Sequence, residues 1–163
     1  MAVKRILVPI DFSADSLHAL AYARDFAKPF GAELVILYVV EPIYYATPAD
    51  MYAVSPNMAV LLDEQRRAGS QQLARLSADL TKKGQRHRTI MKTGSAAQII
   101  VDTAKSSRAD MLIMGTHGRT GLAHLFMGSV AEKVVRTAGC PVLTVRHGAA
   151  KARKRKTVKG AKK

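Results

Sequence analysis

The chain has 163 residues, a mass of 17.7 kDa and a formal net charge of +14, a length that indicates one globular domain with a short extension, since domains average roughly 150 residues. Its single cysteine, Cys140, excludes an intrachain disulfide framework and a multi-cysteine zinc or iron–sulfur site. The longest apolar run, 34–40, is far shorter than the roughly 18 residues of a membrane-spanning helix, and the N-terminus has no secretory pattern, so we expect a cytoplasmic protein.

The chain begins with the pattern of a strand, a helix and a second strand. The apolar run at 5–10 predicts a buried strand, and Ser13 is a suitable N-cap for a helix that ends near Gly31. The run at 34–40 is apolar at every position, which is typical of a strand covered on both faces of a parallel sheet. The apolar face of the helix is expected to carry Leu17, Leu20, Ala21 and Ala27.

The segment 41–57 interrupts this alternation. It contains three of the six prolines and three of the five tyrosines of the chain, which predicts a long loop. Long loops in compact domains are usually functional or disordered, and a surface excursion with its aromatic rings on the core is the alternative.

The second half of the chain alternates helices with strands. The pattern over 57–84 predicts a helix capped by Asn57, and the basic, alternating run 86–91 predicts a strand near a sheet edge. Ser95 and Gln98 form a capping box at the start of the next helix. The remaining predicted elements are a strand at 111–114, a glycine-rich segment at 115–128, a helix through Val130 and Val134 to Gly139, and a strand at 141–145.

This order of elements is typical of one fold class. Strands that alternate with helices predict a doubly wound α/β sandwich, in which a parallel sheet lies between two layers of helices. Residues 1–147 form the expected domain. The tail 148–163 has almost no apolar content, and we expect it to be disordered on its own.

The glycine-rich segment follows the fourth strand and leads into the last helix. It reads Gly115-Thr116-His117-Gly118-Arg119-Thr120-Gly121 and ends at Gly128-Ser129. Helix N-termini receive phosphates, and glycine lets the backbone approach an anion closely. No Gly-Lys-Ser/Thr closes the segment and its first two glycines are three residues apart, so it is neither a Walker A loop nor a dinucleotide fingerprint. Phosphate binding and a purely structural connection both remain open. His117 is expected to be a hydrogen-bonding loop residue, and a contact with phosphate is the alternative.

Asp11 is the candidate polar residue at the end of the first strand. In open α/β sheets, ligands bind beyond the carboxyl ends of the strands where the winding reverses. If the first and fourth strands are neighbours, Asp11, Val39 and the glycine segment line one crevice. Asp11 then accepts a hydrogen bond from an adenine amine or a ribose hydroxyl, or caps the following helix, and the two roles are compatible.

Several segments of the sequence resemble the universal stress protein family. Gly115-x2-Gly118-x9-Gly128-Ser129 matches the family's nucleotide motif. The resemblance covers about residues 1–147 and implies a Rossmann-like three-layer sandwich with a five-stranded parallel sheet in the order 3-2-1-4-5. It also implies the ATP-binding branch of the family and homodimers built around the last strand, Pro141 to Val145. The segments that resemble the first strand, fourth strand, last helix and fifth strand of the family are 5–13, 114–118, 128–134 and 140–145.

The resemblance also implies the residues of an adenine nucleotide site. The expected cofactor is ATP, with Mg²⁺ or Mn²⁺ held mainly by its phosphates. The implied function is a nucleotide-responsive regulator of stress tolerance that binds ATP rather than turning it over rapidly, and a slow ATPase or phosphotransfer enzyme is the alternative, with no catalytic residue assigned. By position, Pro9, Asp11 and Val39 surround adenine and ribose, Met114, Gly115 and Gly118 line the site, and Gly128, Ser129 and Val130 meet ribose or phosphates, with Arg119 nearby.

The basic tail raises a separate question of function. Residues 147–163 hold eight of the lysines and arginines and no acidic residue. Such a tail binds nucleic acid by counterion release, without sequence readout where no groove-reading element is present. A nucleic acid or another polyanion is therefore one expected partner, and a solvated tail is the alternative. An anionic membrane is disfavoured because the tail lacks apolar anchors. The candidate contact residues are Lys151, Arg153, Lys154, Arg155 and Lys156.

Overall fold

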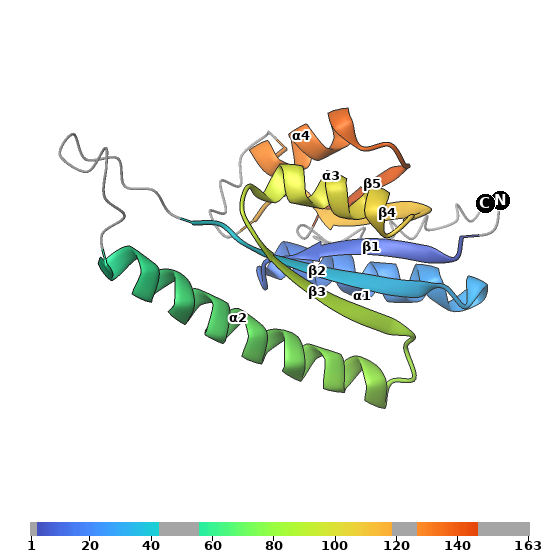
Figure 1. Cartoon of the computed structure of the whole chain (residues 1–163). Helices are drawn as coiled ribbons and strands as arrows, with labels where there is room; N and C mark the ends of the chain where they lie inside the picture. The colour runs from blue at the N-terminus through green and yellow to red at the C-terminus, as the bar shows by residue number, and fades with distance from the viewer. Residues whose placement is uncertain (1–2, 43–55, 119–126, 147–163) are drawn as a thin grey trace, which may run out of the picture.

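A computed structural model describes residues 3–42, 56–118 and 127–146, with side chains described from residue 59 onward in the second range. At its centre is a parallel sheet in the order β3-β2-β1-β4-β5, which confirms the predicted α/β class and strand order (Figure 1). The strands are β1 (Arg5–Ile10), β2 (Glu33–Val40), β3 (His87–Thr93), β4 (Met111–Gly115) and β5 (Val142–Val145).

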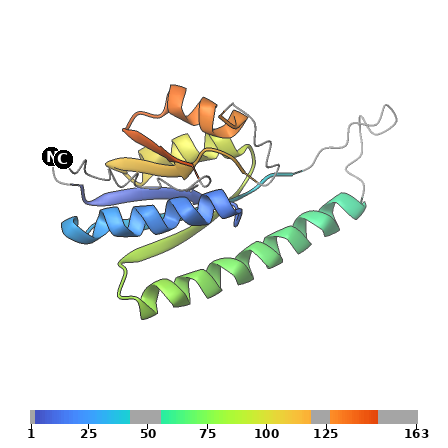
Figure 2. The same ribbon diagram turned by 180° about the vertical axis from the view of Figure 1, so that it is seen from behind.

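Helices cover both faces of this sheet and complete a three-layer sandwich. On one face lie α1 and α2, and on the other lie α3 and α4, as the two opposite views show (Figures 1 and 2). The described helices are α1 (Ala14–Ala27), a 3-10 helix η1 (Lys28–Phe30), α2 (Pro56–Lys82), α3 (Ala96–Ser106) and α4 (Ser129–Thr137). None of them is long and apolar enough to cross a membrane.

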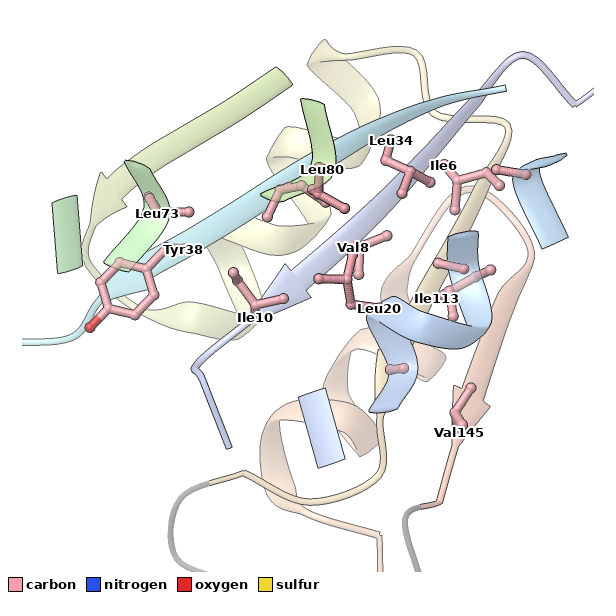
Figure 3. Packing of buried hydrophobic residues seen from close by; sticks show 14 of the residues in the cluster. Ile6, Val8, Ile10, Leu20, Leu34, Tyr38, Leu73, Leu80, Ile113 and Val145 are labelled. Atoms are coloured by element: carbon pink, nitrogen blue, oxygen red, sulfur yellow. The ribbon is translucent and has the colours of Figure 1, made fainter. Parts of the chain in front are cut away.

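The two central strands carry the core. Ile6, Val8 and Ile10 of β1 point into the α1–α2 layer (Figure 3), whereas Leu7 packs in the cluster beneath α3 and α4. Each fully buried aliphatic side chain contributes roughly 1.5–3 kcal/mol of transfer free energy. Because β2 is covered on both faces, its run of apolar residues has no polar alternation, as predicted.

The buried face of α1 differs from the predicted one. Leu20 and Ala27 are buried, but Leu17 is 42% exposed and Ala21 is also exposed. The face that contacts the sheet consists of smaller residues, Ser16, Ala19, Leu20, Ala23 and Ala27. Small side chains on this face let the helix lie close to the strands, and in this orientation the larger side chain of Leu17 faces away from the sheet.

The predicted starts of α2 and α3 need correction. Asn57 lies within α2 rather than capping it, because α2 begins one residue earlier, at Pro56. Proline suits the first position of a helix, where a backbone N–H would have no partner within the helix. The side chain of Ser95 makes no capping bond, so the predicted capping box is absent. The N–H of Ala96 donates instead to Oε1 of Glu41, at 2.7 Å, so a residue that follows β2 caps α3.

Helix α2 lies in close contact with β2 at Gly69. A Cβ atom at this position would overlap the ring of Tyr38, which is 5% exposed and belongs to β2. The glycine therefore lets a long helix settle on an aromatic residue of a central strand.

The two edge strands are the ones with partly exposed side chains. In β3 Arg88, Thr89 and Thr93 are exposed and the other residues are half-buried, and the place of β3 at one end of the strand order confirms the predicted edge position. At the other edge β5 pairs with β4 alone among the strands that the structure describes, and Val142, Leu143 and Thr144 are half-buried. Most of the predicted loop 41–57 lies outside the described residues.

Candidate functional site

The carboxyl ends of β1 and β4 meet at the point where the winding of the sheet reverses. These strands are direct neighbours, with Ile6 opposite Met111 and Leu7 opposite Leu112. Asp11 follows β1 and Gly115 ends β4, so both residues reach the same edge of the sheet. This is the position at which open α/β sheets bind their ligands.

Asp11 and Gly118 are in close contact across this edge. A Cβ atom at position 118 would lie 2.8 Å from Oδ2 of Asp11, a separation that real Cβ atoms do not show. Only glycine therefore fits here without displacing the carboxylate. The sequence predicted that the two residues line one crevice, and the structure brings them together.

The other carboxylate oxygen of Asp11 organises the start of α1. Oδ1 accepts hydrogen bonds from the N–H of Ser13, at 3.0 Å, and from its hydroxyl, at 2.6 Å. Ser13 Oγ in turn accepts from the N–H of Ser16, at 3.2 Å, and is the N-cap of α1, as predicted. Asp11 is thus not the cap itself: it orients the capping residue through one oxygen and lies against Gly118 through the other.

Phe12, which lies between Asp11 and Ser13 in the chain, has a left-handed backbone with φ of 63°. Such a conformation costs a non-glycine residue roughly 1–2 kcal/mol. Its ring packs on Tyr38 with centroids 5.4 Å apart, which holds the turn in place. Strained residues of this kind cluster at functional sites, and nothing in the local sequence pattern identified this one.

The first turn of α1 also contacts the glycine-rich segment. A Cβ at Gly115 would lie 3.0 Å from the backbone and from the Cβ of Asp15, so β4 ends directly against the helix. Oδ2 of Asp15 lies 3.3 Å from Nδ1 of His117, which is also 3.0 Å from Oγ1 of Thr116. His117 is therefore a hydrogen-bonding loop residue, as expected. The sequence analysis did not predict this role of Asp15. An acidic residue is common in the first turn of a helix, where it interacts with the helix dipole, so its position gave no separate signal.

Gly128 joins the end of the glycine-rich segment to its beginning. Its N–H donates to the carbonyl of Thr116 at 2.9 Å, and a Cβ would lie 3.1 Å from the same oxygen. The N–H of Thr116 donates to the carbonyl of Val145, so β5 is tied to the same junction. The N-terminus of α4, with Ser129 exposed at its first position, consequently opens at this edge of the sheet.

Three predicted residues of the site share one face of the sheet. Val39 and Met114 pack in the cluster beneath α3 and α4, together with the half-buried Val130. Pro9 is two residues from Leu7 of the same cluster and is buried on the same face, because side chains of a strand alternate. They form an apolar floor beside the polar contact of Asp11 and Gly118.

Some predicted residues lie outside the described part of the chain. Arg119 is one, and the tail residues Lys151, Arg153, Lys154, Arg155 and Lys156 are the others. Within the described ranges no three or more histidine, cysteine or acidic side chains gather as a metal site.

Cys140 lies just before β5 and is half-buried. Burial, followed by the negative charge of Asp110, raises the pKa of its thiol above the ordinary value. A raised pKa leaves little thiolate at neutral pH, so this cysteine is a packing residue rather than a nucleophile.

The sheet order and the position of the site together define a class. The chain is a Rossmann-like α/β protein with a candidate ligand site at the switch point between β1 and β4. Comparison with known proteins then identifies the family. Residues 2–146 match the model of the universal stress protein family, and the chain belongs to this family.

Individual relatives agree with this assignment. The universal stress protein MJ0531 of Methanocaldococcus jannaschii is 34% identical over 143 residues, which cover 88% of this chain and 82% of the relative. The solved structure of the universal stress protein UspA from Lactobacillus plantarum has a TM-score of 0.78 and 27% identity, and the match covers 90% of this chain and 99% of that one. A solved universal stress protein in complex with cAMP has a TM-score of 0.63 and 27% identity, with 89% and 98% covered.

Proposed function

We propose that this protein is an ATP-binding regulator of stress tolerance, and that ATP binds in the crevice between the carboxyl ends of β1 and β4. The observation that carries this proposal is the contact of Asp11 with Gly118 at the switch point of the sheet. A carboxylate there accepts hydrogen bonds from ribose hydroxyls or an adenine amine, while the glycine leaves room for the backbone to approach phosphates.

The surroundings of this contact suit the two ends of an adenine nucleotide. The apolar floor of Pro9, Val39 and Met114 offers a surface for the adenine ring. The N-terminus of α4, with the hydroxyl of Ser129, offers N–H donors and partial positive charge to the phosphates. Arg119, which follows Gly118 in the sequence, is the proposed further cationic donor, and a Mg²⁺ or Mn²⁺ ion would be held mainly by the phosphates.

A relative supports the ligand class rather than the particular ligand. The 27% identical universal stress protein solved with cAMP binds an adenine nucleotide. An adenylate is therefore the proposed ligand class for this chain, and we propose ATP because the complete glycine motif spans residues 115–129.

We propose that binding, not turnover, is the activity. Two carboxylates lie beside the glycine segment: Asp15 is held against His117, and Asp11 is held by Ser13. Neither is arranged as a general base for an attacking water. Nucleotide binding would order the glycine segment and change a surface that a partner recognises, and a slow ATPase is the alternative.

The experiment that tests this proposal is the release of bound small molecules from the purified, denatured protein, followed by mass spectrometry. Released ATP or ADP would support the nucleotide site, and calorimetric titration with ATP and cAMP would rank the adenylates. Protein that is empty after purification and that takes up neither nucleotide contradicts the proposal. In that case the glycines serve only the strand–helix connection.

We further propose a homodimer through the edge of β5. Among the described strands β5 pairs with β4 on one side, and its other side is a strand edge that can serve as a template for another copy. The nearby helix α4 adds Val135, which is 43% exposed in the single chain. Symmetric pairing of two such edges would bury both surfaces.

The basic tail supports a second candidate function, binding to nucleic acid or another polyanion in the cytoplasm. The supporting observation is the run of eight basic residues without an acidic one. Replacement of Lys151, Arg153, Lys154, Arg155 and Lys156 by glutamine should reduce the salt dependence of DNA binding by a slope of about 4 to 5 while ATP binding stays unchanged. A slope that does not change would leave the tail as a solvated extension.

A further inference from the structure

A recess lies at the amino ends of β2 and β3, at the opposite end of the strands from the proposed nucleotide site. It has a volume of about 330 Å³. The C-terminal ends of α1 and α2 flank it, and both lie at the same end of the sheet (Figure 1). We call this recess the basic groove; it is lined by Arg24, Asp25, Ala27, Lys28, Gly31, Ala32, Lys83, Gly84, Gln85 and Arg86.

The basic groove has more positive charge than its surroundings neutralise. Its lining contains two arginines and two lysines against a single carboxylate, that of Asp25. Asp79 lies nearby and forms a 2.6 Å ion pair with Lys83. The hydrogen bond from Lys83 lowers the pKa of the Asp79 carboxyl, and the positive charges of Arg24 and Lys82 lower it further. The four basic lining residues and Lys82 carry five positive charges. Asp25, Asp79 and roughly half a negative charge at each of the two helix C-termini offset three of them, so an excess of about two positive charges remains.

Capping of the helix ends does not account for these cations. The carbonyls of Ala27 and Lys28 accept from the N–H groups of Ala32 and Gly31, at 3.2 and 3.3 Å. In the same way Leu80 and Thr81 of α2 accept from Gln85 and Gly84, at 3.0 and 2.9 Å. Because backbone amides already satisfy these carbonyls, the basic side chains are not needed to cap them.

The donors that face the groove are incompletely used. Nε of Arg24 is buried and makes no hydrogen bond to any residue that the structure describes. Among the residues that the structure describes, the Arg86 side chain bonds only to the carbonyl of Gly31, at a long 3.4 Å from Nη1. The Arg24 side chain lines the groove, so an anion there can accept from the outer N–H groups of its guanidinium, although Nε itself is enclosed by protein atoms. The two guanidinium groups reach the groove from α1 and from the residue before β3.

We infer that the basic groove binds a phosphate group, either inorganic phosphate or the phosphate of a small monoester. A phosphomonoester carries about −1.5 to −2 charges at neutral pH, which matches the excess positive charge of the groove. Guanidinium forks bind phosphate oxygens in a bidentate manner. This site lies at the other end of the strands from the nucleotide crevice and does not depend on it.

The test is a titration of the isotope-labelled full chain, followed by amide NMR at constant ionic strength. The probes are glycerol phosphate and inorganic phosphate, added to millimolar concentrations. The amides of Gly31, Ala32 and Gly84 report on the basic groove, whereas those of Gly115 and Gly118 report separately on the nucleotide crevice. We expect saturating shifts at the groove amides, with tighter binding of glycerol phosphate if the natural ligand is an ester and equal binding if phosphate alone is recognised.

Charge-matched variants identify the source of the shifts. Arg86 is exposed, so Arg86→Gln should fold normally and weaken binding at the groove by about tenfold. Arg136→Gln removes the same charge from α4, where Arg136 pairs with Glu132, and should leave binding unchanged. The inference is wrong if the groove amides show no saturating shift with either probe, or if Arg86→Gln binds as tightly as Arg136→Gln.

Discussion

At position 118, the absence of a side chain lets the backbone lie directly against the Asp11 carboxylate. The site that we propose for the nucleotide depends on this single contact, since a Cβ would be 2.8 Å from Oδ2. The geometry is specific to the pair: Oδ1 of the same carboxylate is held by Ser13, so Asp11 cannot turn away without loss of two hydrogen bonds.

Gly118→Ala should therefore lower the affinity for ATP by about tenfold or more, because the added methyl displaces the carboxylate that meets the ribose. Isothermal titration calorimetry measures the change. Gly139→Ala is the matched control, since a Cβ there meets no atom within 4 Å. Equal affinity of the two variants would mean that the contact has no part in nucleotide binding.

Asp11→Asn separates the two roles of Asp11. Asparagine keeps an oxygen for Ser13 but loses the negative charge, so we expect stability within about 0.5 kcal/mol of the original protein and ATP affinity reduced by about tenfold. Ser13→Ala should do the opposite, with a loss of roughly 0.5–2 kcal/mol of stability and little change in affinity. Urea unfolding and calorimetry on both variants measure the two effects. If Ser13→Ala lowers affinity as much as Asp11→Asn does, Asp11 acts only through the turn.

Among the secondary-structure elements, α3 has an unexpected cap. Its local sequence predicts capping by Ser95, whereas the structure shows Glu41 accepting from the N–H of Ala96. Glu41 follows β2, so this bond connects the carboxyl end of β2 to the N-terminus of α3, 55 residues further along the chain. An acidic side chain also suits the positive end of a helix.

We predict that Glu41→Ala destabilises the protein by about 1 kcal/mol, the usual cost of a lost N-cap. Ser95→Ala should have a much smaller effect, because the Ser95 side chain makes no capping bond. Thermal or urea unfolding of both variants distinguishes the two residues. If Ser95→Ala destabilises the protein more than Glu41→Ala does, the predicted capping box of Ser95 and Gln98 is correct and the Glu41 cap is not.

Helix α2 is positioned by the contact of Gly69 with Tyr38. Alanine is a better helix former than glycine by roughly 1 kcal/mol, yet overpacking a core costs typically 1–3 kcal/mol. Gly69→Ala should therefore be destabilising overall, because its Cβ would overlap the Tyr38 ring.

A double-mutant cycle tests this explanation. In a Tyr38→Ala background the obstacle is gone, and Gly69→Ala should then be neutral or stabilising. Unfolding free energies of the four proteins measure the coupling. Additive effects would show that the two residues do not constrain each other.

For the whole molecule, the two edges of the sheet differ in their expected roles. We propose that the β5 edge pairs with a second copy, whereas β3 at the opposite edge displays Arg88 and Thr89 to solvent. Charged residues on an edge strand discourage edge-to-edge association.

Thr144→Lys on β5 should convert the proposed dimer into a monomer at micromolar concentration, and Thr89→Lys on β3 should leave it intact. Sedimentation velocity measures both. A native chain that already sediments as a monomer contradicts the dimer, and dissociation by Thr89→Lys alone would move the interface to β3.

Much of the fold and part of the site could be predicted from the sequence. The alternation of apolar runs with helical patterns gave the α/β class, because backbone periodicity is a local property of the chain. The glycine spacing pointed to the end of β4, and the family resemblance supplied the strand order that the structure confirms. The face of α1 and the cap of α3 were predicted wrongly, because each depends on how closely another element approaches.

The sequence alone therefore determined which elements form, where most of them begin and end, and which residues are candidates at the carboxyl ends of the strands. The tertiary structure decided that Asp11 meets Gly118, that Asp15 holds His117, that Glu41 caps α3 and that a basic groove opens between α1 and the start of β3. The physical reason is range. Periodicity and capping act over a few neighbouring residues, whereas these contacts join residues far apart in the chain, which only the packing of helices on the sheet brings together.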